Sequence, residues 1–194
     1  IGHGVTLSEA SAELRTLVRR LGLPVLSSPN GMGCLEMDDP LSLGFIGRNG
    51  TYPANQAGRH ADLVLALGAR FDDRSSSSWL PGYSWNFPTS KLIHVDIDVT
   101  EIGRNYAPTL GIVADVRTIL RQVLGEPDRR GVGGGRLAAW HAQIAGWREE
   151  WEAHIRPNFD IHGTPIRPER VVADVRAVLP DDAILALDSG VHHN

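Results

Sequence analysis

The sequence of 194 residues contains one cysteine, so it has no internal disulfide. It has no cluster of Lys and Arg, and its formal net charge of -4 gives nucleic acid no electrostatic attraction. No apolar run approaches the ~18 residues of a membrane helix, and no charged-then-apolar signal segment opens the chain. These absences predict a globular protein of the reducing cytoplasm that binds neither nucleic acid nor a membrane. The one thiol, Cys34, follows Gly-Met-Gly without a neighbouring base, and we interpret it as structural.

The first 125 residues alternate segments with helical and strand-like patterns. Ser8 is a candidate N-cap for a helix to about Leu21, because apolar residues recur there at helical spacing. A loop rich in glycine and proline is expected from Pro29 to Gly50. The other expected elements are strands at 23–28, 62–68, 91–98 and 111–113 and helices at 54–60 and 116–124. Near-continuous apolar strands separated by helices predict a Rossmann-like α/β domain, a parallel sheet covered by helices on both faces, over residues 1–125.

Residues 126–166 are expected to connect this domain to a second one. The sequence GEPDRRGVGGGR lacks any periodicity and is typical of a linker. A long helix is predicted over 137–155, and one of its faces carries Trp140, Ile144, Trp147 and Trp151. We interpret this stripe as a docking surface of a helix that lies between two domains.

Residues 167–194 predict the beginning of a second α/β domain. A helix is expected to start at Pro168, and a strand is expected over 183–187. That strand leads into a turn that contains Gly190, His192 and His193. Such junctions, at the carboxyl ends of strands, are where open α/β sheets bind phosphate groups. We therefore expect the chain to be a piece of a longer enzyme, although His192 and His193 could also be a solvent-facing pair.

Gly2-His3-Gly4 precedes the first predicted helix and resembles the turn after a strand. In that place two glycines let backbone N–H groups approach a pyrophosphate. The third glycine of the dinucleotide-binding pattern is absent, since Leu7 and Ser8 occupy its region. A nucleotide-binding turn and an ordinary tight turn both remain open.

The segment Gly68 to Arg74, GARFDDR, directly follows a predicted parallel strand and is the strongest candidate site. It crowds two arginines and two aspartates at the carboxyl edge of the sheet, where arginine is suited to bind phosphate with two parallel hydrogen bonds. The alternative is a network of ion pairs on an exposed loop. Gly47 to Thr51 offers further small and polar residues, and Asp96 could accept hydrogen bonds from a ribose or cap a following helix.

The order of several segments resembles the acetolactate synthase large-subunit branch of the thiamine-diphosphate-dependent enzymes. The segments that carry this resemblance are PLSLGFIGRNGT, ADLVLALGARFDDR, KLIHVDIDVTEIGRN, IVADV, PERVVADV and AILALDSGVHH. LGARFDDR and HVDID are the most specific of them. The resemblance covers nearly the whole chain, and it implies the central domain of such an enzyme followed by the start of the diphosphate-binding domain.

The resemblance implies that the central domain binds FAD in a structural role, whereas related branches bind ADP there or nothing. Asn49 departs from the family, which usually has histidine at that position. The residues expected to line the flavin are Arg48, Asn49 and Gly50; those near the phosphates and ribityl chain are Gly68, Arg70 and Arg74; those around the adenosine are Asp96, Ile97, Asp115 and Val116.

The C-terminal turn corresponds to the family's Asp-Val-Gly-Gln-His-Gln. On that correspondence Gly190 and His192 approach the diphosphate of thiamine diphosphate, and His193 lies adjacent. Val191 replaces a glutamine that donates to the phosphate, which removes a contact worth about 1–3 kcal/mol in a dry site.

The resemblance further implies an enzyme that decarboxylates a 2-keto acid and joins the remaining acyl unit to a second carbonyl. The glutamate that assists proton removal and the ligands of Mg²⁺ lie outside this sequence, so this chain alone is expected to be inactive. Active sites between subunits imply a homodimer or homotetramer.

Two other classes of protein stay open at this point. The Rossmann-like alternation also suits a nucleotide-binding module, such as an NAD-dependent deacylase or an electron-transfer flavoprotein domain, but such a module needs no second domain after Gly135. The other class is a decarboxylase or acyltransferase of the same family whose central domain is purely structural.

Overall fold

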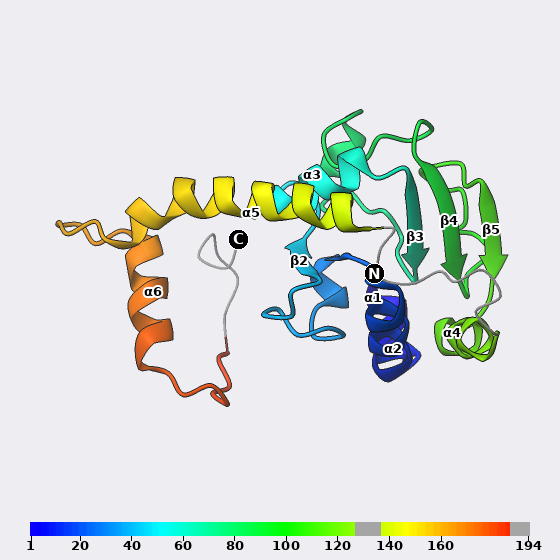
Figure 1. The fold of residues 1–194 in the computed structure, drawn as a ribbon, viewed down its shortest axis with the longest axis horizontal. Helices are drawn as coiled ribbons and strands as arrows, with labels where there is room; N and C mark the ends of the chain where they lie inside the picture. The colour runs from blue at the N-terminus through cyan, green and yellow to red at the C-terminus, as the bar shows by residue number, and fades with distance from the viewer. Residues whose placement is uncertain (127–136, 187–194) are drawn as a thin grey trace. The chain divides into compact units, whose positions relative to one another are not determined.

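The strands that the structure describes form two parallel sheets, both within the first of two compact units, Ile1–Ile144 and Ala145–Asn194. The structure is a computed structural model, and it describes residues 1–126 and 137–186. One sheet pairs β1 (Val25–Ser27) with β2 (Ser42–Phe45). The other has the order β3-β4-β5, with β3 at Leu63–Leu67, β4 at Lys91–Asp96 and β5 at Leu110–Val113. Figure 1 shows the three strands of the larger sheet side by side, all running in one direction.

Helices pack on both faces of these strands, which confirms the predicted α/β class. The helices of the first unit are α1 (His3–Leu7), α2 (Ser11–Leu21), α3 (Tyr52–His60) and α4 (Val116–Gly125), with short 3-10 turns η1 (Pro29–Gly31) and η2 (Ser77–Trp79). α5 (Ala138–Phe159) begins in the first unit and continues into the second, which also contains α6 (Pro168–Val178). Among the described residues, no helix combines the length and apolar character needed to cross a bilayer.

Two apolar clusters hold the first unit together. The first apolar cluster joins α1, α2 and α4 to the carboxyl halves of the strands, and its buried members include Leu14, Leu17, Val18, Leu67, Val95 and Leu120. The second apolar cluster consists of Ile46, Ala66, Phe71, Trp85 and Leu92. Because side chains alternate along a strand, Ala66 and Leu67 reach opposite faces and so belong to different clusters.

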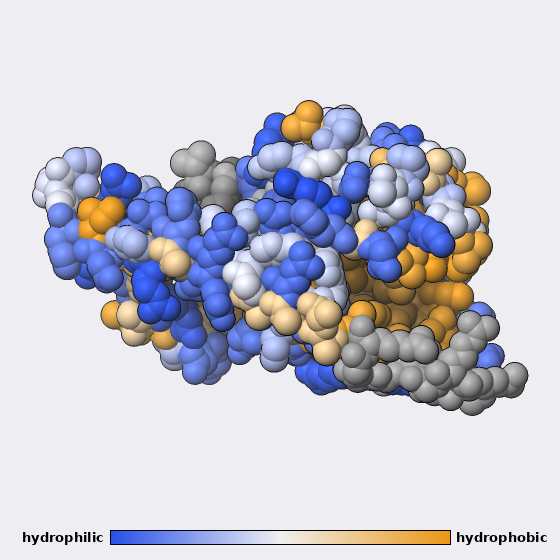
Figure 2. All heavy atoms as spheres, turned by 45° about the horizontal axis from the view of Figure 1, so that its top comes forward, coloured by the Kyte–Doolittle hydropathy of each residue, from blue (hydrophilic) through white to orange (hydrophobic). Residues whose placement is uncertain are grey.

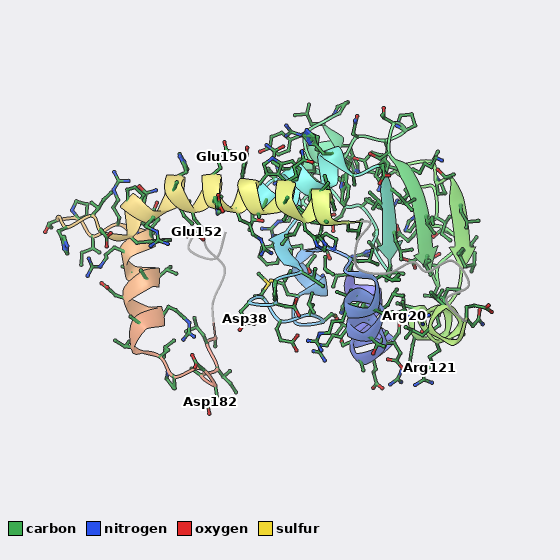
Figure 3. All side chains as sticks on the ribbon, viewed as in Figure 1. Arg20, Asp38, Arg121, Glu150, Glu152 and Asp182 are labelled. Atoms are coloured by element: carbon green, nitrogen blue, oxygen red, sulfur yellow. The ribbon has the colours of Figure 1, made fainter. Side chains whose placement is uncertain are left out.

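Charged contacts on the surface add to the packing of α2 against α4. Glu13 of α2 accepts hydrogen bonds from Arg117 and Arg121 of α4, at 3.2 and 2.8 Å. A hydrogen bond from its own backbone, together with these two guanidinium groups, holds the pKa of the Glu13 carboxyl below its usual range. Arg20 of α2 donates to the carbonyl oxygen of Leu124 at 3.0 Å; Figure 3 labels Arg20 and Arg121 on these two helices.

The structure differs from the expected elements at three places. The helix predicted to begin at Ser8 begins instead at Ser11, because α1 precedes it and the Ser8 hydroxyl donates back to the carbonyl oxygen of Gly4. The loop expected from Pro29 to Gly50 contains β2, whose Gly44 has a φ of 83°. The prediction of a strand over 183–187 is wrong for residues 183–186, which are not in a strand. No described strand lies beside these residues to supply hydrogen bonds, and Ile184 is 98% exposed.

The N-terminus of α4 generates a testable prediction about Asp115. Its carboxylate caps the helix by accepting from the backbone N–H of Thr118 at 2.9 Å, and this bond lowers the pKa of Asp115. We expect Asp115→Ala to reduce the free energy of unfolding at pH 7 by about 1 kcal/mol, whereas Asp115→Asn retains most of the cap.

The measurement is urea unfolding of the unsubstituted chain and the two variants as a function of pH. A lowered folded-state pKa means that the carboxylate stabilises the fold above the ordinary aspartate pKa of about 3.9 and stops doing so as the pH falls below it. The difference in stability between the unsubstituted chain and the Asp115→Ala variant should therefore shrink below about pH 4. A difference that stays constant down to about pH 2 would contradict the cap.

Candidate cofactor site at the carboxyl edge of the sheet

The loop after β3 begins with a close contact between glycine backbones. The N–H groups of Gly2 and Gly4 donate to the carbonyl oxygens of Leu67 and Gly68, at 3.0 and 3.1 Å. Gly68 has a φ of 55°, and a Cβ atom there would lie 2.4 Å from the Cα of Gly4. The Gly2-His3-Gly4 pattern is thus explained by the approach of α1 to the end of β3. Both N–H groups have partners in the chain and are not left to bind a pyrophosphate.

A buried aromatic group fixes the next part of the loop. Phe71 is 4% exposed at a φ of 50°, and its ring meets those of Trp85, Phe87, His94 and Tyr106 with centroids 5.3–5.9 Å apart. Side chains from outside the loop also bind its carbonyl groups: Trp79 Nε1 donates to Phe71 O at 2.9 Å, and Asn105 Nδ2 donates to Phe71 O at 3.0 Å. These buried contacts therefore fix the backbone around Arg70, while the Arg70 side chain is exposed.

His94 supports the same loop from β4. Its Nε2 lies 2.8 Å from the carbonyl oxygen of Ala69 and so carries the proton as donor, while Nδ1 is buried without a hydrogen-bond partner. Burial lowers the pKa of His94, which keeps the ring neutral near pH 7. Sequence reasoning missed this role, although a histidine inside an apolar strand was a visible signal of a buried hydrogen bond.

The residues at the end of β4 lie at the same edge. Asp96 is 8% exposed, and its Oδ1 accepts from the backbone N–H of Asp98 at 3.0 Å. Of its two predicted roles, the cap of a following helix is not found, since a turn follows β4. The next residue, Ile97, is 72% exposed.

The structure brings the Gly47–Thr51 and Gly68–Arg74 segments together. The backbone N–H of Arg48 donates to Arg74 O at 2.9 Å, and the Arg48 guanidinium pairs with the carboxylate of Asp73 at 2.5 Å. A buried Asn55 holds this turn with two hydrogen bonds to the backbone of Gly47, at 3.1 and 2.9 Å. Asn55 was not among the predicted residues, because a mid-helix asparagine gives no distinctive sequence signal.

The residues of the two joined segments differ in exposure. Arg48, Asn49 and Arg74 are exposed. Gly50 is part of the turn itself, since a Cβ there would lie 2.5 Å from Phe45 O.

One cavity of about 980 Å³ reaches this edge. Of the predicted site residues, Gly68, Arg70, Asp96 and Ile97 line it. Arg70 is accompanied there by acidic side chains, those of Asp72, Asp96, Asp98 and Glu101. This edge therefore offers one cation for a phosphate group and several carboxylates that suit ligand hydroxyl groups.

The remaining predicted site residues that the structure describes do not line this cavity. Arg48, Asn49 and Gly50 lie on the neighbouring turn, and Arg74, at the end of the loop after β3, accepts from the backbone N–H of Arg48. Asp115 caps α4, and Val116 is buried in the first apolar cluster. Gly190, His192 and His193 lie outside the described residues.

Comparison with known proteins shows the family to which the chain belongs. Residues 1–123 match the family described as "Thiamine pyrophosphate enzyme, central domain". The chain belongs to this family of thiamine pyrophosphate enzymes. Membership implies thiamine diphosphate as the cofactor of the family.

Several relatives match nearly the whole length of the chain. The acetolactate synthase large subunit of Haemophilus influenzae is 35% identical over 99% of the chain and 32% of its own length. A probable acetolactate synthase large subunit of Methanococcus aeolicus is 35% identical over 93% of the chain and 30% of its own length. The acetolactate synthase isozyme 3 large subunit of Escherichia coli is 31% identical over 99% of the chain and 32% of its own length. The chain therefore spans about a third of the length of these relatives.

The glycine contact at the end of β3 generates a prediction with a matched control. Gly68 and Gly82 both have positive φ, at 55° and 69°, but a Cβ at Gly82 meets nothing within 4 Å. Alanine at either position carries the same backbone strain, and only Gly68→Ala also collides with α1. We expect Gly68→Ala to lower the free energy of unfolding by about 2 kcal/mol more than Gly82→Ala does. Urea unfolding measures the stability of both variants. Equal losses of the free energy of unfolding would show that the packing of α1 does not need the contact.

Proposed function

We propose that the whole protein is a thiamine-diphosphate-dependent enzyme that acts like acetolactate synthase. It decarboxylates a 2-keto acid and joins the acyl unit that remains to a second carbonyl. The observation that carries this proposal is the similarity to acetolactate synthase large subunits over 99% of the chain. Thiamine diphosphate supplies the electron sink for this chemistry when bound.

The first unit serves this enzyme as a nucleotide-binding domain. Arg70 binds the phosphate groups of FAD or ADP, because its guanidinium is exposed beside the cavity on a loop that the aromatic group holds in place. Asp96 accepts hydrogen bonds from a ribose or ribityl hydroxyl with the carboxylate oxygen atom that Asp98 leaves available. Gly68 and Ile97 contact the ligand from the same edge.

The remaining predicted residues extend this arrangement. Arg48, Asn49 and Gly50 contact the flavin from the neighbouring turn, and Arg74 lies near the phosphates and ribityl chain. Asp115 and Val116 belong to the adenosine side of the nucleotide. Gly190, His192 and His193 bind the diphosphate of thiamine diphosphate.

The metal and the catalytic acid–base groups come from other parts of the whole protein. Among the described residues, no group of three or more His, Cys, Asp and Glu side chains is arranged to hold a metal ion. We propose that the Mg²⁺ ligands and the glutamate that assists proton removal lie outside the 194 residues. The fragment alone is then inactive, and the whole protein works as a cytoplasmic homodimer or homotetramer.

The first prediction of this proposal concerns activity. The whole protein, supplied with thiamine diphosphate and Mg²⁺, should release carbon dioxide from pyruvate and form a carboligation product. The measurement is coupled detection of both products, with the 194-residue chain as the inactive control. A whole protein that is folded and binds thiamine diphosphate, but turns over no 2-keto acid, would contradict the proposed reaction.

The second prediction concerns the nucleotide at the carboxyl edge. Arg70→Ala should weaken FAD or ADP binding at least tenfold, since a charge-assisted phosphate contact is worth about 1.5–3 kcal/mol. Arg121→Ala is the control, because Arg121 lies on α4 and does not line the cavity.

Flavin absorbance of the purified whole protein, and release of adenine nucleotides on denaturation, separate the two ligands. A whole protein that binds neither nucleotide has a purely structural central domain. Equal affinity of the two variants would place the phosphates elsewhere.

A further inference from the structure

Three buried polar side chains beside the Gly47–Thr51 turn form a continuous chain of hydrogen bonds. The hydroxyl oxygens of Ser77 and Ser84 lie 2.7 Å apart, and the Ser84 hydroxyl donates to Asn55 Oδ1, also at 2.7 Å. Ser77 and Asn55 are each 8% exposed, and Ser84 is fully buried. We call these three side chains the serine relay. Because a buried polar group is costly without a partner, each member of the relay constrains the position of the next.

The number of donors and acceptors fixes the direction of every hydrogen bond in the serine relay. Ser84 has one hydroxyl proton and gives it to Asn55 Oδ1, so the proton between the two hydroxyl groups comes from Ser77. Asn55 Oδ1 also accepts from the N–H of Gly47, and Asn55 Nδ2 donates to the carbonyl oxygens of Gly47 and Thr51. All four hydrogen-bonding positions of the Asn55 amide are then occupied. The relay and the turn together set the orientation of this amide.

The serine relay starts in a strained stretch of backbone. Ser77, Ser78 and Trp79 have φ angles of 50°, 54° and 56°, in the left-handed region that residues with a Cβ atom disfavour. Hydrogen bonds to the loop after β3 hold this stretch. The N–H of Ser78 donates to Asp73 O at 2.9 Å, and Trp79 Nε1 donates to Phe71 O at 2.9 Å. Strain that the surroundings maintain in this way is typical of functional sites.

Helix α3 holds the middle of the serine relay. Asn55 and Gly58 are three residues apart, so they share one face of this helix. A Cβ atom at Gly58 would lie 2.5 Å from Ser84 O, which shows how closely the helix approaches Ser84. Arg59 donates from Nε and Nη2 to the carbonyl oxygen of Tyr83, at 3.0 and 2.8 Å. These backbone contacts remain when the Ser84 hydroxyl group is removed.

The serine relay ends at a turn that has little freedom to move. Gly47 has a φ of 111°, and a Cβ atom there would collide with the carbonyl oxygen of Arg74. The same carbonyl oxygen accepts from the N–H of Arg48 at 2.9 Å. The position of the turn against the loop after β3 therefore depends on the backbone of Gly47, which Asn55 binds through both its N–H and its C=O group.

The serine relay is separate from the cavity at the carboxyl edge. Ser77, Ser84 and Asn55 do not line the cavity of about 980 Å³, whose apolar lining includes Leu63 and Leu65 of β3. Figure 2 shows a hollow of apolar side chains on the side of the larger sheet. The relay therefore affects a ligand through the position of the Gly47–Thr51 turn, without lining the cavity itself.

We propose that Ser84 is a positioning residue for the flavin half of FAD. Through Asn55 it fixes the Gly47–Thr51 turn, which contacts the flavin in the proposed function on which this inference rests. The ADP half of the same ligand binds Arg70 and Asp96, which line the cavity. The serine relay therefore makes the binding of FAD, and not that of ADP, depend on one buried hydroxyl group.

Equilibrium binding of FAD and of ADP to the whole protein tests the proposal. We expect Ser84→Ala to raise the dissociation constant of FAD at least fivefold and to change that of ADP by less than twofold, because only the turn loses its support. Ser77→Ala, a second variant that leaves the bond between Ser84 and Asn55 in place, should give the same pattern with a smaller effect on FAD. The matched control is Ser90→Ala, since Ser90 is a buried serine, 4% exposed, outside the relay. It should change neither constant.

The other outcomes of this measurement would overturn the proposal. Loss of affinity for FAD and ADP by the same factor would show that Ser84 only supports the domain as a whole. Unchanged affinity for both nucleotides, or a whole protein that binds ADP and not FAD, would show that the turn does not hold a flavin.

Amide hydrogen exchange of the whole protein without nucleotide tests the serine relay independently of the proposed function. Ser84→Ala should speed exchange of the Gly47 amide, which donates to Asn55 Oδ1, at least tenfold. The internal control is the amide of Gly68, which donates to Val95 O at 2.8 Å and should change less than twofold. An unchanged Gly47 amide, or equal acceleration of both glycines, would overturn the relay. A whole protein that binds neither nucleotide would instead contradict the proposed function, and with it the role of Ser84 toward flavin.

Discussion

The contact between the backbone of α1 and the end of β3 is the constraint on which the rest of the first unit depends. Gly4 and Gly68 approach so closely that neither position has room for a side chain. The contact sets the start of α1, and Val5 of α1 is fully buried in the first apolar cluster beside Leu67. It also sets the direction in which the chain leaves β3, and so the place of Arg70 at the carboxyl edge.

The strands and long helices could be predicted because their sequence patterns match their surroundings. β3 and β4 are short apolar runs followed by glycine or aspartate, and the structure has them within the expected ranges. α4 was found through its apolar periodicity, and its N-cap Asp115 confirms the expected start. The position of Gly68, Arg70 and Asp96 at one edge follows from the parallel order of these strands.

Other features depend on contacts that no local pattern contains. α1 has two glycines among or beside its five residues, and it forms because it binds the end of β3 through Gly2 and Gly4. β2 forms inside a segment typical of a loop because β1 supplies its hydrogen bonds. Asn55 supports the candidate site with a pair of buried hydrogen bonds, and His94 supports it with one. Asparagine and histidine occur in many proteins without such a role, so the sequence alone does not reveal it.

The aromatic group beneath the loop after β3 has a consequence for the energetics of ligand binding. Phe71 and its neighbours hold the backbone in one conformation before any ligand arrives. Preorganisation of this kind removes the entropy loss of ordering a loop from the binding equilibrium, which leaves mainly the side chain of Arg70 to be immobilised. A ligand that makes few contacts at this edge can therefore retain a larger share of the favourable free energy of those contacts as binding free energy.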